Sequence, residues 1–194
     1  MTFDEFLRLL GGGVAGSLIT LSIQGAMARY MRPKLIADFG SDVQGAIVEH
    51  PFTVETNPKV QGTKEQWVRI KIQNKGRSAA SNTRVMIVAI NNKATQAKNW
   101  EFSKEVIDCN WAYIKDLSVD IPKDTYRFSD IARLKRENGN TTLEFTGIGA
   151  KNIPGGIERI SVTVLISADN AETVTAEIKL RYDGDAGMVF ENAS

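Results

Sequence analysis

The sequence has very few of the residues that form disulfides or hold transition metals. In 194 residues it contains one cysteine, Cys109, and one histidine, His50. A disulfide within the chain needs two cysteines, and a zinc site built from cysteine and histidine needs three or four such ligands. The sequence therefore excludes both. Residues 183–187 resemble the start of a calcium loop but lack its third oxygen ligand and its closing glutamate, so we expect no metal site and no cofactor.

An excess of charge of either sign is also lacking. The chain contains 24 lysines and arginines and 23 aspartates and glutamates, which leaves a formal net charge of +1. Nucleic-acid binding depends on a strongly positive surface that neutralises phosphates. We therefore expect no nucleic-acid partner. Repeats of useful length and low-complexity tracts are absent from the sequence as well.

Charged residues are missing from one long stretch near the start of the chain, Leu9 to Ala28, with the sequence LLGGGVAGSLITLSIQGAMA. Arg8 precedes this stretch and Arg29 follows it. An α-helix rises about 1.5 Å per residue, so a run of this length spans roughly 30 Å, the thickness of the hydrocarbon core of a bilayer. We therefore predict an N-terminal segment at residues 1–32 that contains a transmembrane helix at 9–28, with the lipid bilayer as its first partner.

Two other interpretations of this stretch are open, a signal peptide and a helix buried in a soluble protein, whereas a surface helix does not fit. Ala26 and Ala28 fit the A-x-A pattern of a secretory signal peptide, but Asp4 and Glu5 stand where a signal peptide has a basic segment. A helix lying on the membrane surface would need a charged face, which this run lacks. A helix buried in a soluble protein is the second alternative.

Small and hydrogen-bonding residues follow one face of the expected helix. In membranes such residues allow two helices to approach closely and to form hydrogen bonds across their interface. The spacing is compatible with self-association of the helix or docking on another membrane protein. Small residues at this spacing are frequent in membrane helices, however, so a monomeric anchor is the simpler interpretation. The residues of this expected packing seam are Gly12, Gly13, Gly16, Ser17, Thr20 and Gln24.

The basic residues beside the stretch indicate which side of the membrane the remainder of the chain occupies. Arg29, Arg32 and Lys34 follow it, whereas Arg8 precedes it. Lysine and arginine favour the cytoplasmic side of a membrane helix. A lone cysteine, Cys109, is also typical of a reducing compartment. We therefore expect a single-pass membrane protein with its domain in the cytoplasm.

After the expected helix, the sequence shows the alternation of antiparallel strands. In residues 65–74, valine and isoleucine alternate with polar residues, as in a strand with one buried face. Residues 160–166 and 174–182 show the same period on either side of a turn, which predicts a hairpin. We expect a mainly β domain over residues 33–183, an antiparallel β-sandwich of about seven strands. A flexible tail is expected at 184–194.

Parts of this domain resemble a known class of protein. The run RIKIQNKGRSAASNTRVMIVAI, residues 69–90, resembles immunoglobulin-like and fibronectin III-like bacterial domains, in which a strand ends in Asn-x-Gly and the next enters the opposite sheet. Residues 32–35 after the hydrophobic run, with 121–124 and 126–131, are similar to uncharacterised membrane-anchored bacterial proteins of this type. The resemblance implies an immunoglobulin-like β-sandwich and no particular activity.

The sequence shows no arrangement typical of a catalytic centre. Nucleophilic catalysis needs an activated nucleophile beside a base. Cys109, between Ile107 and Trp111, is typical of a small buried hydrophobic residue. An enzyme would need His50, Cys109 and a pair of carboxylates to converge in one pocket. We therefore expect no catalytic residues.

Large aromatic side chains are the best candidates for contacts with a partner. Tryptophan and tyrosine dominate binding hot spots. Most large aromatic residues nevertheless pack in a core, and core packing is the interpretation favoured for this set. We expect a non-catalytic, membrane-anchored protein-interaction module. The alternative is an envelope-facing β-sandwich that binds glycans or surface proteins. The candidate residues are Trp67, Trp100, Phe102, Trp111 and Tyr113.

Overall fold

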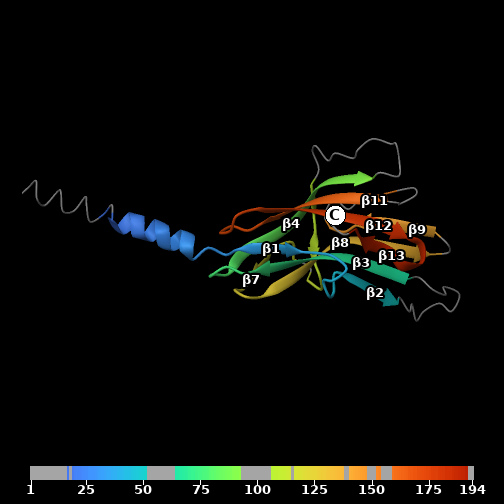
Figure 1. Ribbon diagram of the computed structural model, residues 1–194, viewed down its shortest axis with the longest axis horizontal. Helices are drawn as coiled ribbons and strands as arrows, with labels where there is room; N and C mark the ends of the chain where they lie inside the picture. The colour runs from blue at the N-terminus through green and yellow to red at the C-terminus, as the bar shows by residue number, and fades with distance from the viewer. Residues whose placement is uncertain are drawn as a thin grey trace, which may run out of the picture.

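The computed structural model describes residues 19–51, 64–92, 106–114, 116–137, 140–147, 152–153 and 159–191, together with Ser17. In this part of the chain, two antiparallel sheets pack face to face, and a helix projects from one end of them (Figure 1). The prediction of a mainly β chain folded as a β-sandwich is thereby confirmed.

The first layer, which we call sheet I, has seven strands in the described part of the chain. They are β1 (Leu35–Asp38), β2 (Ile47–Pro51), β3 (Lys64–Asn74), β6 (Asn110–Trp111), β8 (Tyr126–Glu137), β9 (Asn140–Phe145) and β10 (Asn152–Ile153). The order β1-β3-β8-β9-β10 forms its central path. β2 follows β1 along the same edge of β3, and β6 pairs with β8 beyond the end of β9.

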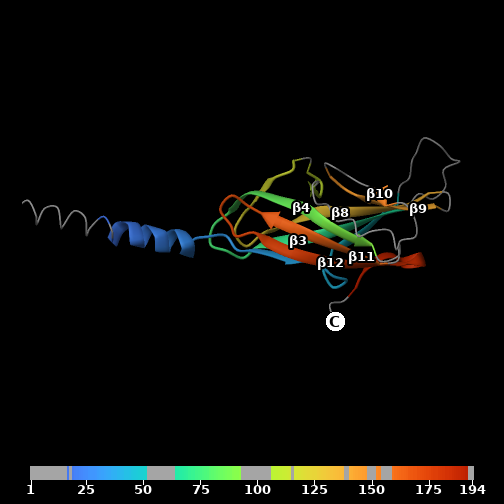
Figure 2. The same cartoon turned by 90° about the horizontal axis from the view of Figure 1, so that it is seen from above.

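The second layer, sheet II, has six strands in the described part of the chain. They are β4 (Ala80–Asn92), β5 (Ile107–Asp108), β7 (Val119–Ile121), β11 (Arg159–Ser167), β12 (Val174–Asp183) and β13 (Gly187–Phe190). The order β13-β12-β11-β4-β5 forms its central path, and β7 pairs with β4. Seen from above, β4 and β11 cross in front of β3 and β8 of sheet I (Figure 2).

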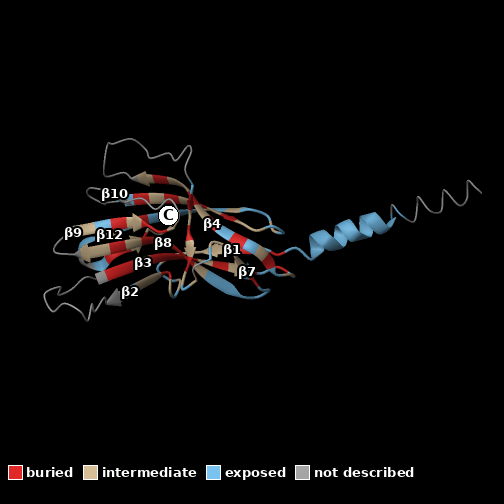
Figure 3. Ribbon diagram, turned by 180° about the vertical axis from the view of Figure 1, so that it is seen from behind, coloured by how far each residue is buried: buried red, intermediate tan, exposed pale blue. Residues whose placement is uncertain are grey.

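The core lies between the two sheets, where alternate residues of each strand point inward. Val68, Ile70 and Ile72 of β3 are fully buried, as their alternation in the sequence predicts. In β11 every second residue from Ile160 to Ile166 is buried as well. Buried segments alternate with intermediate or exposed ones along the strands in Figure 3. The predicted hairpin is confirmed, since β11 and β12 pair along their length.

The helix differs from the sandwich because none of its described residues is buried. Residues 19–30 are helical, and all of them are exposed (Figure 3). Apolar side chains on this helix, such as Leu21 and Met27, are more than 60% exposed. Exposed apolar side chains of this kind mark surfaces that meet a partner or a membrane.

The expected membrane span at 9–28 is described only in its second half. Within the described residues, no helix combines the length and the apolar character needed to cross a membrane. Gly12, Gly13 and Gly16 of the expected seam lie outside the described residues, whereas Ser17, Thr20 and Gln24 are exposed on the helix. The transmembrane helix and its packing seam therefore stay predictions.

The prediction of a flexible tail from residue 184 is wrong for the part that the structure describes. A 3-10 turn, η1 (Gly184–Ala186), leads into β13, which pairs with β12. Met188 is fully buried, and its N–H donates to Oε1 of Gln66 over 2.6 Å. The ring of Phe190 lies 6.3 Å from the ring of Phe39. The domain therefore extends through this strand, whose few apolar residues complete the edge of sheet II.

Candidate interaction surface

The outer face of sheet I contains charged side chains that are nearly excluded from solvent. Because β3 alternates between the core and this face, Trp67, Arg69 and Lys71 lie on the outside. Arg69 is nevertheless only 5% exposed, and Glu65 on the same face is 6% exposed. A charge held away from water is costly unless a partner of opposite charge stabilises it.

Arg69 is paired with Asp130 of β8. The Nε of Arg69 donates a hydrogen bond to Oδ1 of Asp130 over 2.7 Å, and both side chains are almost buried. Val68 pairs with Ala132 and Arg69 with Asp130, so Ile131 is an extra residue of β8, a β-bulge. This bulge places Asp130 opposite Arg69. Burial lowers the pKa of Arg69, but the hydrogen bonds with Tyr113 and Asp130 outweigh burial and raise that pKa.

Tyr113 lies over this ion pair and still faces solvent. Nη1 of Arg69 donates to the Tyr113 hydroxyl over 3.1 Å, and the guanidinium carbon lies 4.8 Å from the ring centroid. Tyr113 is 82% exposed. Its backbone φ of 65° belongs to the left-handed region, which is costly for a tyrosine and persists only where the surroundings hold it. The exposed ring is therefore held in one position from below.

Trp67, two residues before Arg69 on β3, lies beside a second arginine. The guanidinium carbon of Arg133 lies 5.2 Å from the Trp67 ring. Nη2 of Arg133 donates to Oε2 of Glu144 over 2.5 Å, and Nη1 lies 3.6 Å from Oε1 of Glu65. The hydrogen bond from Arg133 lowers the pKa of Glu144 against the opposing effect of its partial burial. These contacts hold Trp67 and Arg133 on the same face as Tyr113.

A third cation lies under an aromatic ring at the other end of β3. Nζ of Lys71 lies 4.5 Å from the ring centroid of Tyr126, which is 51% exposed. Tyr126 and Phe128 contact each other edge to face, with centroids 5.7 Å apart. The outer face of sheet I therefore presents several aromatic rings, three of them stacked on a basic side chain. We call Trp67, Tyr113, Tyr126 and Phe128 the aromatic row.

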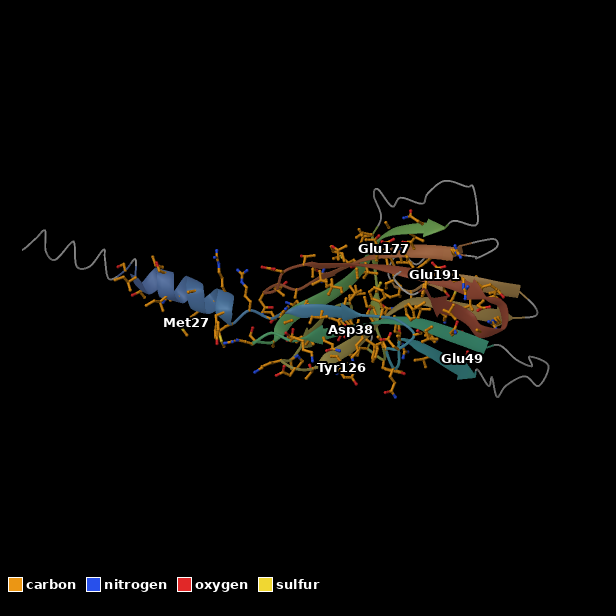
Figure 4. The ribbon with its side chains drawn as sticks, viewed as in Figure 1. Met27, Asp38, Glu49, Tyr126, Glu177 and Glu191 are labelled. Carbon is orange, nitrogen blue, oxygen red and sulfur yellow. The ribbon has the colours of Figure 1, made fainter. Side chains whose placement is uncertain are left out.

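A groove of about 1190 Å³ begins at Tyr126 and Phe128 and continues to residues of β12 in sheet II. Figure 4 shows Asp38 between Tyr126 and Glu191. Oδ2 of Asp38 accepts a hydrogen bond from Nε2 of Gln73 over 2.6 Å. Carboxylates outnumber amines among the lining residues, so the groove favours basic groups of a partner. Its charged residues are Asp38, Asp42, Lys71, Glu177, Lys179 and Glu191.

The structure separates the aromatic residues singled out in the sequence. Trp67 and Tyr113 lie on the same face of sheet I, over arginines of β3 and β8. Trp111 is 1% exposed in the core, and its indole N–H donates to the carbonyl of Leu117 over 3.3 Å, so its selection as a contact residue is wrong. The remaining two candidates, Trp100 and Phe102, lie outside the described residues.

Sequence reasoning missed the basic and acidic residues that support the aromatic row. Arg69 and Lys71 stand at outward positions of β3, and this alternation with Ile70 and Ile72 was a usable signal. Asp130 had no comparable signal. It lies 61 positions from Arg69, and a β-bulge in the pairing of β3 with β8 sets their contact.

The described residues offer little for nucleophilic or metal chemistry. Cys109 is completely buried, and this burial raises the pKa of its thiol to about 12. The thiol is therefore protonated and inaccessible at neutral pH. The side chain of His50 lies outside the described part of the chain. Within the described part, no group of three or more histidine, cysteine, aspartate or glutamate residues could hold a metal ion.

Comparison of the chain with protein-family models, with curated proteins and with solved structures finds no match.

Proposed function

We propose that the chain is a non-catalytic, membrane-anchored interaction module that binds a protein partner through the aromatic row. The observation that carries this proposal is the exposed ring of Tyr113, held in place by the buried Arg69. A tyrosine that is already fixed gives a large contact area with little loss of conformational entropy on binding. Tyrosine, tryptophan and arginine are also the residues most enriched in binding hot spots.

The membrane anchor and the cytoplasmic domain belong to the same proposal. The uncharged run at 9–28, together with the exposed apolar side chains of the helix at 19–30, supports an anchor. The basic residues that follow the run support a cytoplasmic domain. The polar and small residues of the seam would allow two anchors to associate, which would present two aromatic rows side by side.

We infer further that the sandwich has an immunoglobulin-like topology. In that fold, strands A, B and E share one sheet, and strands G, F and C share the other. The order β1-β3-β8 in sheet I and β12-β11-β4 in sheet II supports the same assignment. The neighbour of β8 differs, because β9 follows β8 in the sequence, whereas strand D precedes strand E in an immunoglobulin domain.

Site-specific photocrosslinking tests the proposed interaction. The full-length protein, with benzoylphenylalanine in place of Tyr126, is produced in its own cells and irradiated. We expect an adduct with one protein of defined mass, and we expect Tyr113→Ala to remove it. Thr175→Ala is the matched control, because Thr175 is exposed on β12 at the outer face of sheet II, and it should leave the adduct unchanged.

Two outcomes would contradict this assignment. An adduct that survives Tyr113→Ala, or no adduct at position 126, would exclude the aromatic row as the contact surface. Binding to a glycan array that Tyr113→Ala removes would favour the envelope-facing alternative instead. In that case, external protease should also digest a C-terminal tag in cells stripped of their outer wall, whereas a cytoplasmic domain is protected.

A further inference from the structure

The chain leaves the helix through a segment that is fixed against the turn between β3 and β4. The N–H of Lys75 donates to the carbonyl of Lys34 over 2.8 Å, and the N–H of Arg77 donates to the carbonyl of Arg32 over 3.3 Å. These bonds extend the antiparallel pairing of β1 with β3. Residues 32–34 are therefore attached to the sandwich along their length.

Asn74 and Gly76 make this attachment possible. The side-chain oxygen of Asn74, which is fully buried, accepts the N–H groups of Lys34 and Gly76 over 3.3 Å and 3.0 Å. A Cβ atom on Gly76 would lie only 2.4 Å from Cα of Pro33. Gly76 has no positive φ, so close packing rather than a left-handed backbone selects glycine here.

The attachment gathers basic side chains from two distant parts of the sequence. A hollow of about 740 Å³ at the junction is lined by five basic residues and by one acidic residue, Glu172. The guanidinium carbon of Arg77 lies 3.3 Å from the ring centroid of Tyr30 at the end of the helix. All five basic side chains are exposed. We call these residues the basic collar: Arg29, Arg32, Lys34, Lys75 and Arg77.

Three further acidic residues do not line this hollow: Asp120 in β7, Asp124 between β7 and β8, and Asp169 between β11 and β12. Asp169 accepts a hydrogen bond from Nδ2 of Asn82 over 2.6 Å, and Asp120 accepts one from the N–H of Asn82 over 2.9 Å. The carboxylate of Asp124 lies 3.7 Å from the amine of Lys123. Five basic residues against Glu172 leave the hollow with a net positive charge, although the chain as a whole is almost neutral.

We propose that the basic collar binds anionic lipid headgroups of the membrane that holds the helix. The collar lies where the helix joins the sandwich, beyond Met27 in Figure 4, which is the headgroup level for an inserted helix. Tyr30 stands beside it, and aromatic residues are enriched at that level. Clusters of lysine and arginine next to a membrane helix attract anionic lipids. Because Lys75 and Arg77 belong to the sandwich, this contact fixes the orientation of the domain on the membrane.

Lysine labelling in nanodiscs tests the inference. The full-length chain is reconstituted in discs of phosphatidylcholine alone or of phosphatidylcholine with phosphatidylserine, and acetylation by an N-hydroxysuccinimide ester is followed by mass spectrometry. We expect Lys34 and Lys75 to react several-fold more slowly in the anionic discs. Lys179, exposed on β12, should react equally in both. Salt at about 1 M, where the Debye length is roughly 3 Å, should remove the difference.

Charge-reversal variants identify the residues responsible. Lys75→Glu combined with Arg77→Glu should abolish the protection of Lys34. Lys123→Glu, on the turn between β7 and β8, should leave that protection unchanged. Inorganic phosphate added to phosphatidylcholine discs should protect none of these lysines. Protection by phosphate alone would assign the collar to a soluble anion and overturn the lipid proposal.

This inference rests on the proposed membrane anchor, and the two can fail separately. If the chain enters both kinds of disc and Lys75 reacts equally in them, the collar does not bind anionic lipid. If the chain enters neither kind of disc, the anchor is wrong. Flotation with phosphatidylserine vesicles then tests whether the basic collar binds anionic lipid. Flotation that Lys75→Glu with Arg77→Glu abolishes supports lipid binding, and no flotation overturns it.

Discussion

Nε of Arg69 lies 2.7 Å from Oδ1 of Asp130, and this nearly buried pair on the outer face of sheet I supports the exposed Tyr113. Asp130 holds the guanidinium, and the guanidinium holds the hydroxyl and the ring of Tyr113. The backbone carbonyl of Asp130 in turn accepts a hydrogen bond from the hydroxyl of Thr146 over 2.7 Å. Because the ring of Tyr113 is held by the groups beneath it, its position depends on the stability of the ion pair.

Asp130→Ala should destabilise the domain strongly, because it leaves the buried Arg69 without its carboxylate. We expect a loss of about 3–5 kcal/mol in the free energy of unfolding, measured by urea denaturation. Arg69→Met combined with Asp130→Leu should recover most of this loss, since an apolar pair leaves no buried charge. An unchanged denaturation midpoint in Asp130→Ala would show that the ion pair is solvated.

Gly76→Ala should destabilise the domain and loosen the start of β1. The new Cβ would lie 2.2 Å from the backbone nitrogen of Lys34, so the segment before β1 must move. We expect a loss of about 1–3 kcal/mol and faster hydrogen exchange of the Lys75 and Arg77 amides. Gly25→Ala is the control, because its added Cβ meets nothing within 4 Å. Equal stability of the two variants would contradict the close packing.

Alkaline pH should destabilise the domain through Cys109. Burial raises the pKa of the thiol from 9.0 to about 12, so between these values the folded state keeps a proton that the unfolded state has lost. Stability should therefore fall as pH rises through this window, by up to about 1.4 kcal/mol per pH unit from this group. Urea titrations of Cys109→Ala should show a smaller alkaline slope. A slope identical to that of the natural chain would exclude a buried thiol.

Acid should weaken the pair between Arg133 and Glu144. The hydrogen bond from Arg133 lowers the pKa of Glu144 below its ordinary value of 4.5, so this contribution is present above that pH and is lost as pH falls through the lowered value. Glu144 is partly exposed, so we expect less than about 1 kcal/mol. Glu144→Gln should be less stable than the natural chain at neutral pH, and the difference should shrink below pH 4.5. A difference that does not change with pH would contradict the pair.

The two-layered β fold could be predicted from the sequence, because the alternation of apolar and polar residues within a strand is a local signal. The alternation in residues 65–74 and the hairpin of β11 and β12 depend on neighbouring residues, and the structure confirms both. β13 was missed because its four residues are too few to show a period. Its place depends on a contact of Met188 with Gln66, 122 positions earlier.

Only part of the candidate site could be predicted from the sequence, because the rest depends on long-range pairing. Trp67 and Tyr113 could be selected by residue type alone. The burial of Trp111 and the support of Tyr113 by Arg69 depend on how β6 and β3 pair with β8. Such long-range registers leave no pattern in a single sequence, because each partner is an ordinary polar or aromatic residue in its own segment.

The hydrogen bonds that tie residues 32–34 to the turn after β3 limit how far the sandwich can travel. A flexible tether would let an anchored domain sweep a wide volume and meet partners at many distances from the membrane. Because this segment is hydrogen-bonded to Lys75 and Arg77, it cannot act as a flexible linker. An anchored sandwich of this kind has a short and nearly constant reach. If the chain is anchored as proposed, the sandwich would therefore select partners by their height above the bilayer as well as by their surface.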